Sequence, residues 1–246
     1  MKKEIAIIGF GRFGRLLARE LRRDFLVAAA DRRGVIGPGV KPVSVRQAAA
    51  RKIVILAVPA GKLKRLLTEI APMLAPGTLV VEVCAVKEAP VRWMKELLPH
   101  SVELLSLHPL FGPTSARRGL RGHSVVLCPV RLAPGRLASV TRYLRSKGLA
   151  VRRSTPAGHD RVMASTLFVT QLIGRALAPV VPARMPLATP NARLLRTIIQ
   201  SSVNDSAELF RDIYRYNRFA RSVALSVMRR CRSLLPKTSG LAATDG

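Results

Sequence analysis

The sequence predicts a doubly wound α/β domain with a mostly parallel sheet, followed by an all-α domain. Three observations support this. Short β-rich runs alternate with helical patterns through the first half of the chain, several of these runs are apolar almost throughout, and the strand signal stops near residue 155. Apolar strands that alternate with helices are typical of a parallel sheet covered on both faces.

The expected strands and helices alternate, except that no helix is expected between the strands at 102–107 and 124–130. Strands are expected where short β-rich runs occur, at residues 4–10, 25–30, 52–58, 78–84, 102–107, 124–130 and 149–154. Helices are expected where apolar residues recur at helical spacing, at residues 12–23, 44–50, 62–74, 91–98 and 137–148.

The second half of the chain carries only helical patterns. Residues 159–181 predict one long apolar helix, and a Pro-rich segment at 178–190 separates it from residues 191–235, where apolar positions recur every three or four residues. These apolar faces exceed what one helix pair can bury, so we expect a homodimer through this region. We therefore divide the chain into an α/β domain, a helical domain and a disordered tail: residues 1–155, 156–235 and 236–246.

The composition is unusual in its charge. Forty-two Lys and Arg against 14 Asp and Glu give a formal net charge of +28, which is typical of proteins that bind nucleic acid or another polyanion. However, the basic residues are scattered through every segment, and seven Phe, three Tyr and one Trp offer little stacking surface for single strands. This distribution favours a composition bias laid over an ordinary enzyme, with nucleic-acid binding as the alternative.

Cysteine usage and hydropathy predict a cytoplasmic protein without a metal site. Cys84, Cys128 and Cys231 fit no metal-ligand spacing and cannot all pair, so we expect reduced thiols. No apolar run approaches the length that spans a bilayer, and a glycine-rich turn follows the first apolar run, as expected for a strand rather than a signal peptide. We therefore expect no membrane association.

A glycine-rich loop follows the first expected strand and opens the first expected helix: Gly9-Phe10-Gly11-Arg12-Phe13-Gly14. In this context the pattern predicts a dinucleotide site and a Rossmann domain. Gly9 makes the tight turn, Gly11 lets the backbone approach a pyrophosphate at the helix N-terminus, and Gly14 allows close helix–strand packing. A glycine-rich turn that binds nothing is the alternative.

Asp31 closes the second expected strand, where a carboxylate binds the ribose 2′-hydroxyl and favours NAD because it repels a 2′-phosphate. Arg32 and Arg33 follow, and they would serve a 2′-phosphate if Asp31 turned away, so NADP stays open. The turn Ala57-Val58-Pro59 ends the third expected strand. Such a turn commonly lines the nicotinamide side of the crevice, although simple chain reversal explains it equally well.

Several segments resemble the prephenate and arogenate dehydrogenases, which make tyrosine or its immediate precursor. The similar segments share the family's order: GFGRFG at 9–14, AVP at 57–59, EVCAVKEAP at 82–90, HPLFGP at 108–113, HDRVMASTLFVTQLIGRAL at 159–177 and NDSAELFRDIYRYNRFA at 204–220. The last is similar to arogenate-using plant members in particular. The resemblance covers about residues 4–222. It implies an NAD(P)-dependent dehydrogenase that decarboxylates arogenate or prephenate oxidatively.

The resemblance implies a role for His108, which ends an apolar strand run. From its position alone, His108 is either a packed structural histidine or a base at the sheet rim. In the family it is the general base that accepts the C4 hydroxyl proton while hydride leaves C4 and CO₂ departs. Arg193, in TPNARLL, matches the arginine that binds the ring carboxylate in many bacterial members, with a solvated helix arginine as the alternative.

Two positions, Ala85 and Gln171, depart from the family pattern, and a third, Asp205, bears on the choice of substrate. Ala85 stands where the family has a serine that hydrogen-bonds the catalytic histidine or the substrate hydroxyl, and Gln171 replaces a substrate-contacting histidine. Asp205 aligns with the acidic position that favours arogenate, because a carboxylate suits the side-chain ammonium of arogenate and repels the keto acid of prephenate.

Three further residues match family positions. Asp160 is expected to cap the long helix, and its neighbour His159 is either structural or faces the crevice. Lys87 is expected to orient the loop that contains Ala85.

Two other function classes stay open. The first is another β-hydroxyacid- or imine-type oxidoreductase, but these usually rely on a catalytic lysine in the helical half, and residues 159–235 contain no lysine. The second is a catalytically impaired Rossmann-type binding protein with a polyanion partner, which Ala85 and the charge of +28 favour.

Overall fold

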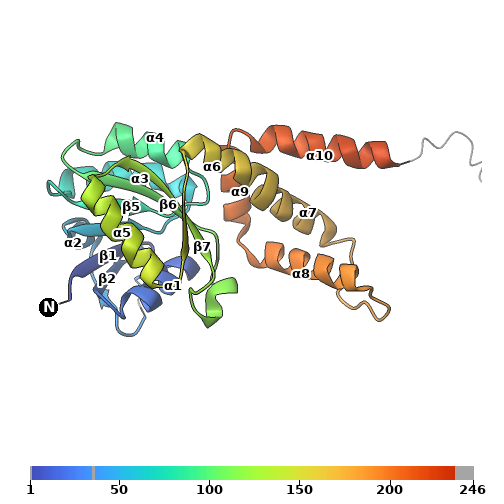
Figure 1. The fold of residues 1–246 in the computed structure, drawn as a ribbon, viewed down its shortest axis with the longest axis horizontal. Coiled ribbons are helices and arrows are strands. Elements are labelled where there is room, and N and C mark those ends of the chain that lie inside the picture. Colours follow the sequence, from blue (N-terminus) through green and yellow to red (C-terminus); the bar gives the residue numbers. More distant parts are fainter. Residues whose placement is uncertain (1, 35–36, 236–246) are drawn as a thin grey trace, which may run out of the picture.

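The computed structural model describes residues 2–34 and 37–235, and the expected tail at 236–246 lies outside the described residues. Eight strands form one sheet in the order β3-β2-β1-β4-β5-β6-β7-β8 (Figure 1). Neighbouring strands are parallel except for the β6–β7 pair, so the predicted mostly parallel sheet is confirmed. The strands are β1 (Glu4–Ile8), β2 (Leu26–Ala30), β3 (Lys41–Pro42), β4 (Ile53–Leu56), β5 (Leu79–Glu82), β6 (Glu103–Pro109), β7 (Ser124–Arg131) and β8 (Ala150–Arg153).

Helices cover both faces of this sheet, which explains why its strands are apolar almost throughout. Along β1, Ala6 and Ile8 face one core while Ile5 and Ile7 face the other, because successive side chains alternate across a strand. The first core lies under α2, α3 and α4, and the second lies under α1 and α5. These helices are α1 (Arg12–Leu21), α2 (Val45–Ala49), α3 (Ala60–Ile70), α4 (Glu88–Leu97) and α5 (Pro134–Ser146).

The second half is helical, as predicted, but its helices begin and end at other residues than expected. The helix expected at 159–181 begins at Pro156, ends at Leu177 and contains a π-helical segment, and residues 191–235 form three helices instead of a continuous pattern. Ser206 starts the second of these three because its side chain accepts a hydrogen bond from Leu209 N at 3.1 Å. The elements are α6 (Pro156–Met163), the π segment (Ala164–Phe168), α7 (Val169–Leu177), α8 (Pro190–Asn204), α9 (Ala207–Tyr216) and α10 (Ala220–Leu234).

The π segment changes which side chains share a face of the α6–α7 rod. A residue advances an α-helix by about 100°, so His159 and Gln171, twelve positions apart, would point about 120° away from each other in a regular helix. A π turn accommodates one extra residue, which brings the two side chains to nearly the same face. Both are 3% exposed.

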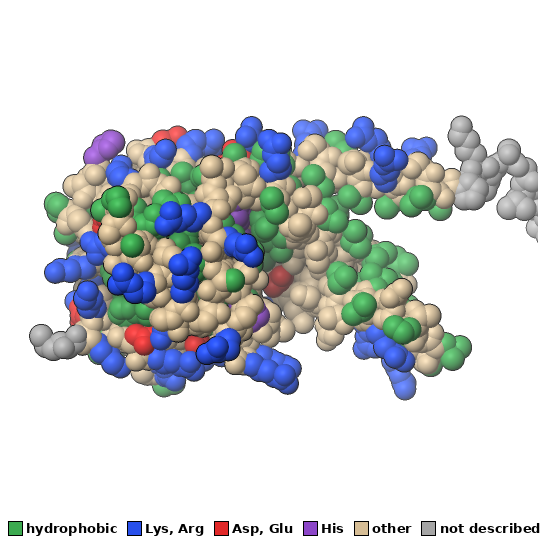
Figure 2. All heavy atoms as spheres, in the orientation of Figure 1, with side chains coloured by type: hydrophobic (Ala, Val, Ile, Leu, Met, Phe, Trp, Pro, Cys, Tyr) green, Lys and Arg blue, Asp and Glu red, His purple; other side chains and the backbone are tan. Residues whose placement is uncertain are grey.

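The helical half projects away from the sheet (Figure 1). Helices α7 and α8 form an antiparallel hairpin, and α10 contacts the rest of the fold through its first turns, where Ala220 and Ala224 are buried. Figure 2 shows apolar side chains gathered over these projecting helices. In the part of the chain that the structure describes, we find no helix long and apolar enough to span a bilayer.

The α7–α8 hairpin depends on a close approach at Gly174. A Cβ atom at this position would lie 2.5 Å from the Cβ of Ser202 and closer still to its hydroxyl oxygen. We expect Gly174→Ala to lower the free energy of unfolding by about 1–3 kcal/mol through overpacking, measured by urea denaturation. Gly135→Ala in α5 is the control, because a Cβ there meets no atom of the described residues within 4 Å. Equal stability of both variants would contradict this packing.

Candidate active site

The glycine-rich loop between β1 and α1 has the geometry of a phosphate cradle. Gly9 has a φ of +101°, and a Cβ there would lie 2.5 Å from the carbonyl oxygen of Ala57. A Cβ on Gly14 would overlap the carbonyl oxygen of Gly9, whereas a Cβ on Gly11 would meet, among the described residues, only a guanidinium nitrogen of Arg33 at 3.9 Å. The first and last glycines therefore allow the turn to close, and Gly11 leaves the backbone accessible from outside.

Helix α1 presents a free N-terminus behind this loop. Its N-cap is Gly11, which supplies no side-chain cap, and its first turn contains no acidic residue. The first N–H groups of a helix lack intrahelical partners and carry the positive end of its dipole, so this terminus suits a pyrophosphate. The expected dinucleotide site therefore fits the residues present.

Asp31 is turned toward the loop. Its Oδ2 accepts the backbone N–H of Phe10 at 2.6 Å, and its Oδ1 accepts the backbone N–H and Nε of Arg33 at 2.9 and 3.1 Å. Burial alone would raise the pKa of Asp31, but the hydrogen bonds from Arg33 and Phe10 lower it below the usual value. The expected neighbour Arg32 instead pairs with Glu69 at 3.1 Å.

The turn at residues 57–59 packs directly under the glycine loop. Ala57 N donates to Ile8 O at 2.8 Å, and Pro59 is the N-cap of α3. Asp212 from α9 accepts the N–H of Gly61 at 3.1 Å, so the helical half caps a helix of the α/β half. The turn thus joins the loop to the second domain, a contact that its sequence did not predict.

Arg12 connects three of the expected site segments. Its Nη1 donates to Asn204 O at 2.5 Å, and its Nη2 donates to Thr114 Oγ1 at 3.4 Å. Asn204 precedes Asp205, and Thr114 lies in the loop that follows His108. The neighbouring Phe13 contacts the same loop, with its ring centroid 6.5 Å from that of Phe111. The glycine loop, the loop after β6 and the end of α8 therefore meet at one place.

His108 lies near the carboxyl end of β6. Because β1, β4, β5 and β6 are parallel, this is the sheet edge that also carries the glycine loop. His108 is 7% exposed, and its Nδ1 lies 2.7 Å from Nε2 of His159. Burial, and then the neighbouring His159 and Lys87, hold the pKa of His108 well below its ordinary value. Its Nε2 has no hydrogen-bond partner among the described residues, so a neutral imidazole has one nitrogen free to accept a proton.

A buried ion pair supports the strand that carries His108. Lys87 Nζ lies 2.5 Å from Glu82 Oε1 and donates to Leu107 O at 3.0 Å, and the hydroxyl of Ser106 donates to the same Glu82 oxygen. The side chains of Lys87, Glu82 and Ser106 are fully buried. Removing one partner of such a pair costs about 3–5 kcal/mol. Sequence reasoning missed Glu82 and Ser106; the signal was a polar residue within each apolar strand run.

Asp160 caps a different helix from the one expected. Its Oδ1 and Oδ2 accept the backbone N–H groups of Lys87 and Glu88 at 2.8 and 2.9 Å, at the start of α4. The expectation that it caps its own helix was wrong, because α6 begins at Pro156 and Thr155 is its N-cap, accepting from Gly158 N at 3.0 Å. Asp160 therefore lies inside α6 and reaches across to the α/β half.

Gln171 and Asp205 lie together, and Arg175 holds them. Gln171 Nε2 donates to Asp205 Oδ2 at 2.7 Å, while Arg175 donates through Nε to Gln171 Oε1 at 3.3 Å and through Nη2 to Asp205 O at 2.7 Å. Sequence reasoning missed Arg175, although it lies within the HDRVMASTLFVTQLIGRAL segment. Asp205 Oδ1 has no hydrogen-bond partner in the described ranges.

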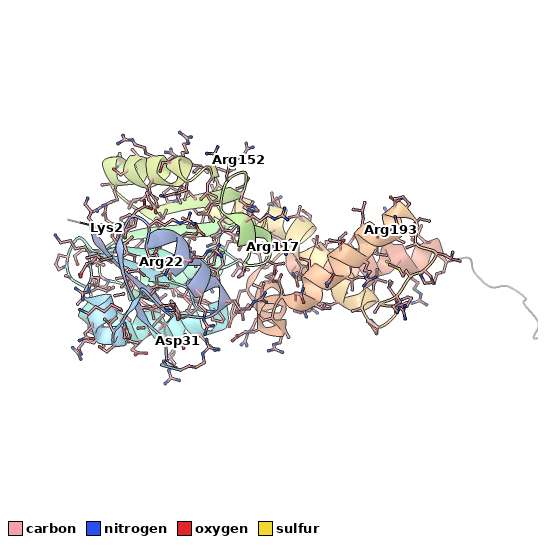
Figure 3. The ribbon with its side chains drawn as sticks, turned by 90° about the horizontal axis from the view of Figure 1, so that it is seen from below. Lys2, Arg22, Asp31, Arg117, Arg152 and Arg193 are labelled. Atoms are coloured by element: carbon pink, nitrogen blue, oxygen red, sulfur yellow. The ribbon has the colours of Figure 1, made fainter. Side chains whose placement is uncertain are left out.

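Two expected site residues stand apart from this arrangement. Arg193 is exposed on the first turn of α8, and Figure 3 shows it far out on the helical half, away from Asp31. Asn204, at the other end of α8, contacts Arg12, so Arg193 lies about 16 Å along the helix from that contact. Ala85 lies in the loop between β5 and α4 and packs against the core. The partner of the His108 ring is His159 in place of the family's serine.

No group of three or more His, Cys, Asp or Glu side chains within residues 2–34 and 37–235 is arranged to hold a metal ion. The candidate site consists instead of a free helix N-terminus, a carboxylate turned toward the glycine loop and a buried histidine, all at one sheet edge. This combination defines a Rossmann-type protein built to hold a dinucleotide beside a proton acceptor.

Comparison with known proteins narrows this class. Residues 21–152, more than half of the chain, match the family described as "Prephenate dehydrogenase, nucleotide-binding domain". The chain therefore belongs to the prephenate dehydrogenase family. It is 27% identical to arogenate dehydrogenase 2 of Arabidopsis thaliana over 239 residues, covering 87% of this chain and 64% of the plant protein. The chain spans less than two thirds of the length of the curated relatives it matches.

Solved structures show the same fold. Prephenate dehydrogenase from Aquifex aeolicus, in complex with hydroxyphenyl propionate and NAD+, gives a TM-score of 0.73 at 18% identity, covering 95% of this chain and 90% of that one. Arogenate dehydrogenase from Synechocystis gives a TM-score of 0.69 at 21% identity, with coverage of 94% and 90%. The predicted α/β Rossmann domain followed by a helical region is thus confirmed.

The depressed pKa of His108 predicts a pH-dependent stability. The folded protein keeps His108 neutral, whereas the unfolded chain protonates this residue below about pH 6.5, so the unfolded state binds more protons there. The free energy of unfolding should therefore fall as the pH drops below about 6.5, with a contribution from this group of at most about 1.4 kcal/mol per pH unit.

Urea denaturation between about pH 7 and pH 5 measures this dependence. We expect the slope to be smaller in His108→Asn than in the unmodified protein. The control is His100→Asn, which removes an exposed histidine that precedes β6. A slope that His108→Asn does not alter would contradict the buried neutral state.

Proposed function

We propose that this chain is an NAD(P)-dependent dehydrogenase that decarboxylates arogenate oxidatively to tyrosine, with prephenate as the alternative substrate. The observation that supports this most is the neutral, buried His108 at the sheet edge that also carries the glycine loop. Residues 1–155 would hold the dinucleotide, and residues 156–235 would complete the substrate site and form a dimer. The names of the relatives, arogenate and prephenate dehydrogenases, agree with this activity.

His108 provides the proton chemistry of this reaction. A dinucleotide held by the glycine loop and the N-terminus of α1 would supply the acceptor for the hydride that leaves C4 of the ring. As C4 becomes a carbonyl carbon, its hydroxyl proton moves to Nε2 of His108, the nitrogen that has no protein partner. Loss of CO₂ from C1 then returns an electron pair to the ring, which becomes aromatic. A neutral imidazole is the right acceptor, since an imidazolium has no lone pair.

NAD is the cofactor that the site favours. Asp31 stays at the loop with its carboxylate ionised, where it can accept ribose hydroxyl hydrogen bonds and repels a 2′-phosphate. The pairing of Arg33 with Asp31 offsets part of this repulsion, and NADP is therefore the second cofactor to test.

Arogenate is the substrate that Asp205 favours. One carboxylate oxygen of Asp205 is bound to Gln171, and the other has no partner within the described ranges. A free carboxylate oxygen suits an ammonium group, and it disfavours the keto acid side chain of prephenate. Arg175 fixes the backbone of Asp205 and thereby orients this oxygen.

A homodimer would cover the projecting helices. Large apolar side chains are exposed on α8 and α10, with Leu194 at 64% and Met228 at 57% exposure. Exposed apolar surface of this extent marks an interface in most proteins. A second copy would also offer a position for Arg193, which lies at the opposite end of α8 from the contact between Asn204 and Arg12. The three cysteines are free, which supports a reducing, cytoplasmic location.

The activity is tested with the purified chain, NAD or NADP, and arogenate or prephenate, following the absorbance of reduced cofactor. We expect turnover with NAD and arogenate, and His108→Asn should lower kcat by about 10²- to 10⁴-fold, the usual contribution of a general base. His100→Asn is the control and should keep its activity, since His100 is exposed at the opposite end of β6.

Two outcomes would refute the proposal. Full activity of His108→Asn would show that this residue is not the base. If no cofactor and substrate pair gives turnover and the chain binds DNA or RNA in a salt-sensitive manner, the polyanion-binding alternative would replace the enzyme.

The dimer is tested by substituting a residue of its expected interface on α8. Leu194→Glu should shift the chain from dimer to monomer in sedimentation velocity, because it places a charge on the exposed apolar side of α8. Leu26→Glu is the matched control, since Leu26 is 55% exposed but lies on β2, far from α8. A monomeric unmodified chain, or a Leu194→Glu variant that stays dimeric, would contradict this interface.

Mixed dimers test whether Arg193 serves the partner's site. If it does, mixing inactive Arg193→Ala with inactive His108→Asn restores one site per mixed dimer, because that site receives His108 from one copy and Arg193 from the other. If the mixture stays inactive, Arg193 does not act across the interface.

A further inference from the structure

A chain of hydrogen bonds runs from His108 into the interior of the protein. His108 Nδ1 lies 2.7 Å from His159 Nε2, and His159 Nδ1 lies 2.8 Å from Asp160 Oδ1. The exposures of these residues are 7%, 3% and 0% from the first to the last. Because the sheet and α6 supply opposite ends of this chain, both halves of the fold are needed to form it.

The direction of each hydrogen bond in this chain can be assigned from Asp160. Its two oxygens already accept the N–H groups of Lys87 and Glu88, so it also acts as the acceptor toward His159. A neutral His159 that donates from Nδ1 has its lone pair on Nε2. His108 must then donate from Nδ1, and its own lone pair is left on Nε2, the nitrogen with no protein partner.

We propose that His159 and Asp160 are positioning residues, which hold His108 as the Nδ1–H tautomer and stabilise the imidazolium that forms when Nε2 takes a proton from substrate. This inference rests on the proposed function. In the step, the substrate O–H bond breaks, its electron pair stays on oxygen, and a new N–H bond forms at Nε2. The Nδ1 proton of His108 is then shared with His159, whose own Nδ1 proton is shared with Asp160.

The surroundings of His108 explain why such support is needed. Burial, then any charge on His159 and the charge of Lys87, all disfavour a positive charge on the imidazole of His108. The ionisable groups packed around the hydrogen-bonded residues His108, His159 and Asp160 are Lys87 and Glu82 on the β5 side and Cys128 on β7. Lys87 and Glu82 pair with each other, and burial first of all raises the pKa of Cys128 to about 11, which keeps it neutral. Asp160 is therefore the negative group that contacts the histidine pair.

Histidine tautomers give a test that does not depend on activity. Nitrogen-15 NMR of the full chain distinguishes Nδ1–H from Nε2–H imidazoles, and this chain has four histidines to assign. We expect His108 and His159 both to be Nδ1–H at neutral pH, and we expect His108 to lose this preference in His159→Phe. If His108 in the unmodified chain is the Nε2–H tautomer, the proposal is overturned, whether or not the chain is a dehydrogenase.

If the unmodified protein turns over substrate, steady-state kinetics test whether His159 and Asp160 stabilise the imidazolium of His108. His159→Phe should lower kcat by about 10- to 100-fold, as expected when the partner that orients a functional histidine is lost, with KM for cofactor and substrate changing little. It should also shift the acidic limb of the pH–rate profile, where the rate falls because His108 takes up a proton. His159→Gln, whose amide oxygen can still accept from His108 Nδ1, should recover part of kcat.

His123→Gln is the matched control, because His123 lies in the loop beyond His108 with its ring 5.1 Å from Phe111 and takes no part in the hydrogen-bond chain. A His159→Phe protein that folds, with the rate and pH profile of the unmodified chain, would overturn the positioning role. Absence of turnover in the unmodified chain would instead refute the proposed function. The NMR measurement would then still decide whether His108 is the Nδ1–H tautomer.

Discussion

The buried carboxylate of Asp160 is the interaction on which the arrangement of the two halves depends. It belongs to α6, yet its oxygens accept the first N–H groups of α4 and the ring of His159, and its backbone carbonyl accepts Asn217 Nδ2 at 2.7 Å. A fully buried charge costs several kcal/mol unless such donors surround it. Docking of the helical half and orientation of His108 are therefore one event, because the same atoms serve both.

A second buried charge pair acts from the other side of His108. Lys87 and Glu82 are fully buried, and Lys87 holds the carbonyl of Leu107, the residue before His108. The backbone N–H of Lys87 also donates to Asp160, so Lys87 contacts both buried carboxylates, Glu82 and Asp160. The end of β6 is thus fixed in position by polar contacts within an otherwise apolar sheet. Rigid support of this kind suits a residue that must stay within hydrogen-bond reach of a ligand.

Contacts between the halves also surround the expected cleft. Arg12 reaches from the glycine loop to the end of α8, Asp212 reaches from α9 to the start of α3, and Arg218 pairs with Glu88 at 2.9 Å. Figure 2 shows the surface hollowed at this junction. Four acidic side chains make contacts across this junction: Glu88, Asp160, Glu208 and Asp212.

The sequence by itself determined the local features of this protein. Alternating strands and helices, the glycine loop, Asp31 at a strand end and His108 at another are patterns that neighbouring residues define, and each was found where expected. Only the tertiary structure decided which distant residues meet: that Asp160 caps α4, that a π segment turns Gln171 toward the face of His159, and that Arg193 lies away from its own site. The physical reason is that these outcomes depend on helix packing and on burial of charge across the domain junction, which no single stretch of sequence encodes.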